Sequence, residues 1–178
     1  MKKVFNFLFL NLITLIIFIS CASEDERVTY KIDKVSNTNK ILTIELFEMN
    51  GFKKVKNYDV SSLPYASSAY YGWFKDDLSN PRDYELRFYI NHESALSSKK
   101  IIEEVIGKDA ILATREVTWK EGNSDRRVNR RGAGSGPGSA KAKYLYYLIY
   151  ENVVILCEGL DEEESIKLCN LIINKFSD

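Results

Sequence analysis

The side chains best suited to acid–base chemistry are few in this sequence. The single histidine, His92, stands beside Glu93 and Ser94 at an expected helix start, and it fits an N-terminal helix position better than a general base. Asp76 and Asp77 are adjacent and could bind a cation, but two neighbouring loop acids are usually solvated. No nucleophile elbow, metal-ligand run or cofactor fingerprint occurs. We therefore expect no catalytic residue, metal or cofactor, and we keep an enzyme of unknown type as the alternative.

Two cysteines, Cys157 and Cys169, lie near the C-terminus. The strand expected to hold Cys157 leads directly into the helix expected to hold Cys169, so a helix that folds back brings the two together. A disulfide across so short a loop stabilises a fold by about 3 kcal/mol. The alternative is a pair of buried free thiols that pack as small apolar side chains. A zinc site would need more ligands, and a redox motif would need a CxxC spacing, so we favour the disulfide.

A third feature is a loop in which Arg126, Arg127, Arg130 and Arg131 precede a glycine-rich stretch over 132–139. Such a loop could contact an anion or an anionic membrane surface. It is not a P-loop, because no Gly-Lys-Ser/Thr follows it. The favoured interpretation is a flexible, charged connection between strands over about 120–143.

Aromatic side chains are concentrated on the expected strands. An exposed aromatic face can stack on a glycan or on an envelope protein, but sheet cores also collect aromatics through packing alone. We favour the core interpretation. The residues are Tyr70, Tyr71, Trp73, Phe74, Phe88, Tyr89, Tyr144, Tyr146, Tyr147 and Tyr150.

Hydrophobic periodicity and turn residues indicate the elements that position these side chains. Alternation of apolar and polar residues over 84–90 predicts a half-buried antiparallel strand, whereas 153–157 is apolar throughout and predicts a central strand covered on both faces. Further strands are expected over 28–32, 52–58, 69–74, 111–119 and 144–150. Helices are expected over about 39–50, for which a strand is the competing interpretation, over 92–106, and after Asp161.

Local signals support the ends of several elements. Asn91 and Asp161 can cap helices, and Gly51 and Gly107 can end them. Glu151-Asn152 is expected as a two-residue hairpin turn, in which Asn tolerates positive φ. Residues 28–178 are therefore predicted to form a single α+β domain. It would have a mostly antiparallel sheet of about five or six strands, with about three helices packed on one face.

The N-terminus has a different character from the rest of the chain. Lys2 and Lys3 precede an almost wholly apolar run over 4–19, and Phe18-Ile19-Ser20-Cys21 is followed at once by polar residues. A charged start, an apolar stretch and a small residue before a cut site are typical of a secretory signal. The segment resembles the lipobox of bacterial lipoprotein precursors, although Phe18 replaces the usual Leu. We recognise no family for the remainder of the chain.

This resemblance implies a signal peptide over 1–20, a cut before Cys21, and fatty-acid (palmitate-type) chains on the Cys21 lipid. Residues 21–27 would then be a short tether to the membrane. Ala22 resembles the residue found in proteins sent to the outer membrane, so the cell membrane and the outer membrane are both open. An uncleaved transmembrane helix and an ordinary secretory signal are the alternatives, and the apolar run is short for the former.

The net charge of the chain limits the classes of partner that it is expected to bind. The chain has 25 basic and 25 acidic residues, and removal of Lys2 and Lys3 leaves 23 against 25, a net charge of −2. Nucleic-acid binders usually carry a strong basic excess, so we expect no nucleic-acid partner. The resulting expectation is a lipid-anchored extracytoplasmic module of the cell envelope that binds, senses or assists another component, and is no enzyme.

Overall fold

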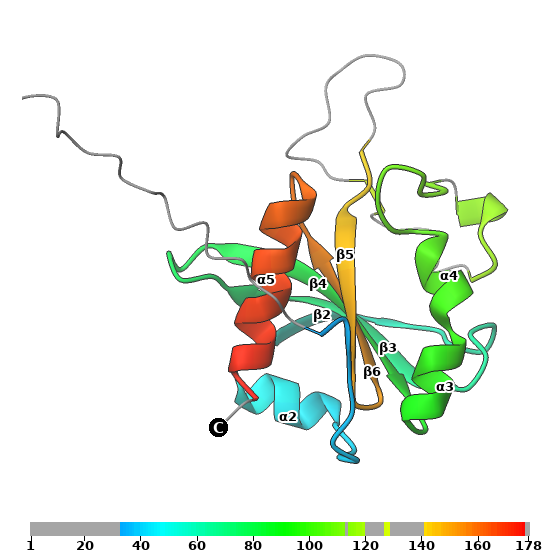
Figure 1. Ribbon diagram of the computed structural model, residues 1–178, viewed down its shortest axis with the longest axis horizontal. Coiled ribbons are helices and arrows are strands. Elements are labelled where there is room, and N and C mark those ends of the chain that lie inside the picture. Colours follow the sequence, from blue (N-terminus) through cyan, green and yellow to red (C-terminus); the bar gives the residue numbers. More distant parts are fainter. Residues whose placement is uncertain (1–32, 113, 120–126, 129–140, 177–178) are drawn as a thin grey trace, which may run out of the picture.

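A six-stranded sheet organises the part of the chain that the structure describes. The computed structural model describes residues 33–112, 114–119, 127–128 and 141–176. The order across the sheet is β1-β5-β6-β4-β3-β2 (Figure 1). The strands are β1 (Val35–Ser36), β2 (Lys53–Tyr58), β3 (Ala66–Lys75), β4 (Pro81–Tyr89), β5 (Tyr144–Tyr150) and β6 (Val153–Glu158). The helices are α2 (Ile44–Met49), α3 (His92–Ser97), α4 (Lys99–Glu103), α5 (Glu162–Asn174) and the short 3₁₀ helix η1 (Thr114–Glu116).

The predicted α+β class and mostly antiparallel sheet are confirmed. Every neighbouring pair of strands is antiparallel except β1 and β5, which are parallel. The hairpin of β5 and β6 has the predicted bounds and the predicted two-residue turn. The positive φ of that turn, 55°, falls on Glu151 and not on Asn152.

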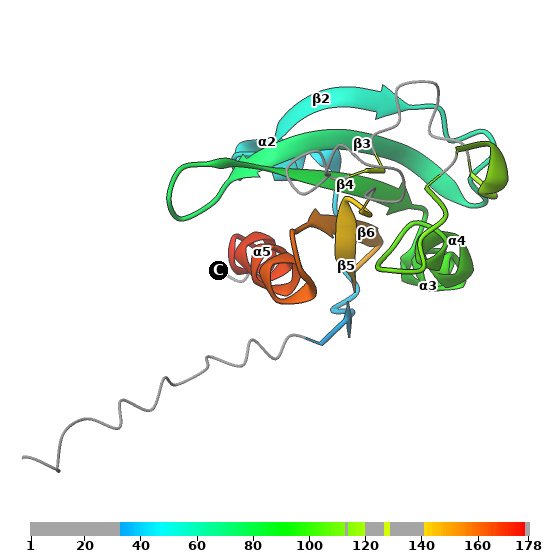
Figure 2. The ribbon, with the colours of Figure 1, turned by 90° about the horizontal axis from the view of Figure 1, so that it is seen from above.

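Helices cover both faces of the sheet, and here the expectation of a single helical face was wrong. One core contains Phe47 of α2 and Leu168 of α5 with alternate residues of β4 and β6. The other contains Ala95 of α3 and Ile102 of α4 with Tyr89 of β4 and with Val154 and Leu156 of β6. Figure 2 shows α5 on one side of β5 and α3 and α4 on the other. The side chains of the central strands are apolar or form ion pairs on both faces of the sheet, so other elements must cover each face.

Strand β4 is buried on both faces and is not the half-buried strand that its alternation predicted. Tyr84, Leu86 and Phe88 lie in one core as expected, but Glu85 and Arg87 on the opposite face are also fully buried. Ile90, which was expected to continue the buried face, is 62% exposed because it lies beyond the end of the strand.

Three predicted helices form, with changed bounds. Helix α2 begins at Ile44, five residues later than predicted, and ends as expected with Gly51 at a φ of 99°. The predicted helix over 92–106 divides into α3 and α4 at Ser98, whose hydroxyl donates a 2.7 Å hydrogen bond to the carbonyl of Ala95. A serine hydroxyl bonded to a preceding carbonyl competes with regular helix geometry. The caps at Asn91 and Asp161 form as predicted.

The predicted strand over 111–119 was wrong. The region contains η1, and no sheet ladder holds the described residues that follow it; a side chain at the C-terminal end of α4 holds them instead. The carboxylate of Glu104 accepts hydrogen bonds from the Thr118 N–H, at 2.7 Å, and from the Thr118 hydroxyl. Val117 and Trp119 are buried, as the alternation required, but in a covering segment and not in a strand.

Several predictions fall on residues that lie outside the described part of the chain. They are the signal peptide and tether with Cys21, the strand over 28–32, most of the connection over 120–143, and Arg126, Arg130 and Arg131. Among the helices that are described, none is long and apolar enough to cross a bilayer.

Candidate functional site

An open groove of about 360 Å³ lies beside the start of α2. Its rim carries two strongly exposed aliphatic side chains, Ile41 and Ile90, each 62% exposed. Its floor is apolar, with Leu42 and Phe88 from the core. Ligand pockets usually measure about 300–1,000 Å³, so the groove is large enough for a small ligand or for one or two side chains. The remaining lining residues are Thr43, Ile44, Glu45, Ser67, Ser68, Tyr70, Tyr89 and Asn152.

The β5–β6 turn fixes one wall of this groove. The Asn152 side chain accepts a 2.7 Å hydrogen bond from the Leu42 N–H and donates bonds of 3.2 Å to the Leu42 carbonyl and 3.0 Å to the Tyr89 carbonyl. These contacts join residues far apart in the sequence. They hold the chain before α2 against the end of β4, and they place Ile41 and Ile90 on the same rim.

The neighbouring Glu151 holds the chain just before the groove. Its carboxylate is buried and accepts bonds of 2.9 Å and 3.0 Å from the Thr38 N–H, 2.6 Å from the Thr38 hydroxyl and 3.1 Å from the Lys40 N–H. Burial raises the pKa of Glu151, but these hydrogen bonds and the charge of His92 outweigh it, so its pKa lies below the ordinary value. His92 itself lies 2.6 Å, through Nδ1, from the Glu151 carbonyl oxygen. The histidine therefore contacts the turn at the start of α3.

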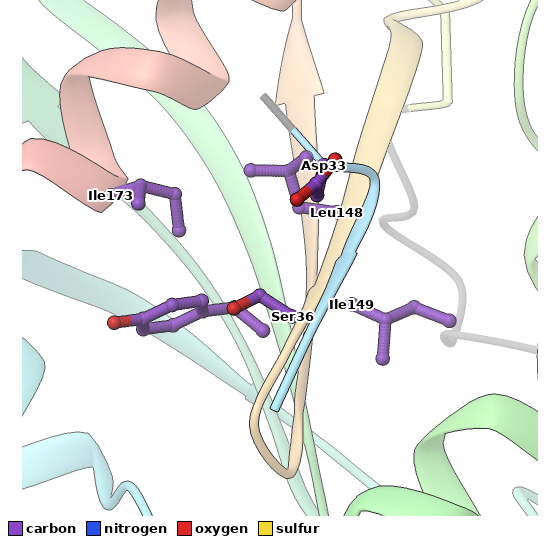
Figure 3. Close-up of a pocket in the computed structure, with 6 residues that line it drawn as sticks. Asp33, Ser36, Leu148, Ile149 and Ile173 are labelled. Carbon is purple, nitrogen blue, oxygen red and sulfur yellow. The ribbon is translucent and has the colours of Figure 1, made fainter. Parts of the chain in front are cut away.

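A second, smaller pocket of about 170 Å³ lies where the described chain begins, between β1, β5 and α5. Figure 3 shows Leu148 and Ile173 on the α5 side of β5 and Ile149 on the opposite side. Asp33 supplies a carboxylate to its lining, and Ser36 and Tyr150 supply hydroxyl groups. Its volume is below the usual range for ligand pockets, so the groove beside α2 is the stronger candidate.

The opposite face of the sheet contains a buried ion pair. Arg87 Nε lies 2.6 Å from Glu85 Oε1, and both side chains are fully buried. The guanidinium also lies over the ring of Trp119, with Cζ 4.6 Å from the ring centroid. The attraction between the two opposite charges and the contact of the guanidinium with an aromatic face offset the cost of removing these charges from water. This arrangement explains why a strand with charged residues on one face can be central.

Arg127 is the one member of the predicted arginine cluster that is described, and it does not form an exposed contact surface. It is 2% exposed, and it donates a 2.7 Å hydrogen bond to the carbonyl of Trp119. Arg127 therefore gives no support to the anion or membrane contact considered as the alternative for this cluster, which stays a prediction for Arg126, Arg130 and Arg131 outside the described residues. Its neighbours in sequence gave no sign that it anchors the covering segment over the sheet, because that contact depends on the fold.

The predicted disulfide is present between Cys157 of β6 and Cys169 of α5. Their Cα atoms are 5.6 Å apart, and both residues are fully buried. The Ser165 hydroxyl adds a 2.6 Å hydrogen bond to the Cys157 carbonyl. The first turn of α5 and its middle are therefore both attached to the central strand.

The remaining candidates from the sequence are the Asp76-Asp77 pair and the strand aromatics. Asp76 closes the β3–β4 turn by accepting bonds from the N–H groups of Leu78 and Asn80 and from Arg82 Nε at 2.6 Å, and these bonds hold its pKa below the ordinary value despite its burial. Within the described ranges, no group of three acidic, His or Cys side chains is placed to hold a metal ion. The strand aromatics divide between fully buried rings, such as Tyr144, and half-buried rings, such as Trp73.

Sequence reasoning missed the groove. Ile41 was assigned to a helix and Ile90 to a buried strand face. The one available signal was that both aliphatic residues stand next to expected element ends.

The fold and these sites together define a small, disulfide-bonded α+β domain with an open apolar groove. The chain belongs to a family of unknown function (DUF6810), whose model matches residues 43–178. No curated protein and no solved structure matches it significantly.

Proposed function

We propose that this chain is a lipid-anchored, extracytoplasmic protein of the cell envelope whose domain binds a partner and performs no reaction of its own. The observation that carries the proposal is the pairing of Cys157 with Cys169. The sequence has three cysteines, so this pairing leaves Cys21 as the remaining one. Disulfides persist in oxidising compartments outside the cytoplasm, and Cys21 stands where a lipobox carries its lipid.

Lipidation is tested on the purified product by intact mass and by labelling with a fatty-acid analogue. We expect a mature N-terminus at Cys21 bearing fatty chains, and no label in the Cys21→Ala variant. Ser23→Ala is the matched control, because it lies outside the lipobox-like segment, and it should label like the wild type. An intact Met1, or a free thiol at Cys21, would contradict the proposal.

We assign the partner contact to the groove beside α2 and take its occupant to be an extended polypeptide segment with an aliphatic side chain. The exposed rim residues Ile41 and Ile90 and the apolar floor favour an aliphatic group. Thr43 and Ser68 add hydroxyl groups that suit the main chain of such a segment. The remaining charge at the groove is one exposed carboxylate, Glu45, so the groove does not select an anion.

This contact is tested by photo-crosslinking from positions 41 and 90 in the anchored protein, with position 78 as the control. Leu78 is 81% exposed and lies in the β3–β4 turn, away from the groove. We expect one protein to crosslink from 41 and 90 but not from 78. Its purified form should bind the Ile90→Asp variant about tenfold more weakly, a loss of about 1.4 kcal/mol, and the Leu78→Asp variant equally well. Equal crosslinking from 78, or unchanged binding by Ile90→Asp, would refute the assignment.

A further inference from the structure

Two exposed lysines flank a half-buried tryptophan at the β2 edge of the sheet. Lys53 of β2 pairs directly with Trp73 of β3 in the antiparallel ladder, so the two side chains share one face. Lys75 lies two residues further along β3 and therefore on the same face. Lys53 and Lys75 are exposed, and Trp73 is partly exposed. We call these three residues the Trp73 patch.

The acidic residue nearest to the Trp73 patch along the ladder is already paired. Asp83 of β4 lies opposite Trp73 on its other side, and its Oδ2 is 2.5 Å from the Nζ of Lys143. Neither Lys53 nor Lys75 forms an ion pair with a residue that the structure describes. The patch therefore presents two positive charges beside an aromatic ring.

This combination suits the surface of an anionic bilayer. Tryptophan rings favour the level of the lipid head groups, where the ring is partly buried and its N–H stays hydrated. Lysine ammonium groups near an anionic membrane gain from its negative surface potential. We propose that the Trp73 patch contacts anionic phospholipid head groups and holds the domain down on the membrane to which Cys21 is anchored.

The length of chain before the domain permits this orientation. The inference rests on the proposed anchor at Cys21. The described chain begins at the β1 edge of the sheet, and the Trp73 patch lies at the opposite, β2 edge (Figure 2). Five strand spacings separate the two edges, about 24 Å. The twelve residues from Ala22 to Asp33 can span at most about 40 Å. The tether is therefore long enough to connect Cys21 in the membrane to a domain whose β2 edge lies against that membrane.

The inference is tested by tryptophan fluorescence of the lipidated protein in vesicles that contain brominated lipids. Vesicles of phosphatidylcholine alone are compared with vesicles that also contain phosphatidylglycerol. The second tryptophan, Trp119, is 1% exposed and supplies an unquenched background, which the Trp73→Phe variant measures directly. We expect quenching of Trp73 in the anionic vesicles alone, and its loss at high salt.

Charge variants separate the patch from general attraction to the membrane. The Lys53→Gln/Lys75→Gln variant should lose the quenching, whereas Lys99→Gln/Lys100→Gln, which removes two exposed charges from α4, should keep it. Protein that floats with both kinds of vesicle but shows no quenching in the anionic ones would refute the contact of the Trp73 patch and leave the lipid anchor intact. Protein that floats with neither overturns the lipid anchor, and the inference falls with it.

Discussion

The side chain of Asn152 binds both main-chain polar groups of Leu42, with Oδ1 2.7 Å from the Leu42 nitrogen and Nδ2 3.2 Å from its oxygen. This pairing imitates one rung of a sheet at a place where no strand continues. It joins the β5–β6 turn to the chain that enters α2, 110 residues earlier. The groove depends on it, because the Leu42 segment forms one wall.

Replacement of Asn152 by Ala should therefore reduce the free energy of unfolding by about 3 kcal/mol, because it leaves buried main-chain groups of Leu42 and Tyr89 without partners. Denaturant unfolding with the disulfide intact measures the change. Asn57→Ala, on the exposed edge strand β2, should change stability by less than about 0.5 kcal/mol. A loss below about 1 kcal/mol in Asn152→Ala would show that water replaces these bonds.

Acid should weaken the fold partly through Glu151. The pKa of this carboxyl is lower in the folded chain than in the unfolded chain, so its contribution is present above the ordinary carboxyl range near pH 4.5 and is lost as pH falls through the folded value. Asp76 contributes with the same sign. The Glu151→Gln variant should show a shallower decline in unfolding free energy between about pH 6 and pH 3 than the wild type. Glu93→Gln, an exposed change on α3, should retain the wild-type decline.

Removal of the disulfide should destabilise the domain without changing its topology. The bridge closes a sequence separation of 12, for which loop-closure entropy gives about 3 kcal/mol. We expect Cys157→Ala/Cys169→Ala to lower the unfolding free energy by about that amount and to keep the far-ultraviolet circular dichroism spectrum. An unchanged denaturation midpoint would mean that packing around Leu168 and Ile172 holds α5 in place by itself.

The buried pair of Glu85 and Arg87 should show strong coupling. Replacement of Arg87 by Met removes the cation that lies 2.6 Å from the buried Glu85 Oε1, and it should cost about 3–5 kcal/mol. The double variant Glu85→Met/Arg87→Met removes both charges and should be much closer to the wild type. Thermal unfolding of the two single variants and the double variant gives the coupling energy. Additive losses would show that the two side chains act independently.

Local patterns predicted the elements whose stability is mostly local. The β5–β6 hairpin and the caps of α3 and α5 all depend on neighbours within a few residues, and they form as predicted. The disulfide could also be predicted from the sequence, because the strand and the helix that carry its two cysteines are consecutive.

Features that depend on long-range contacts could not be predicted in this way. The alternation predicted Glu85 and Arg87 to be exposed, but this face is interior, and Trp119 lies over the Arg87 guanidinium. Arg127 appeared to be part of a solvated basic run, but its guanidinium bonds the Trp119 carbonyl. Glu151 was expected only as a turn residue, although its carboxylate holds Thr38 across more than a hundred residues.

The bridge between Cys157 and Cys169 also affects how the molecule would withstand damage. Residues 159–161, which connect β6 to α5, include exposed positions that a protease can reach. A single cut there would leave the C-terminal helix covalently attached to the central strand. A nicked molecule would keep its last helix, and the break would become visible only when a reducing agent released the fragment.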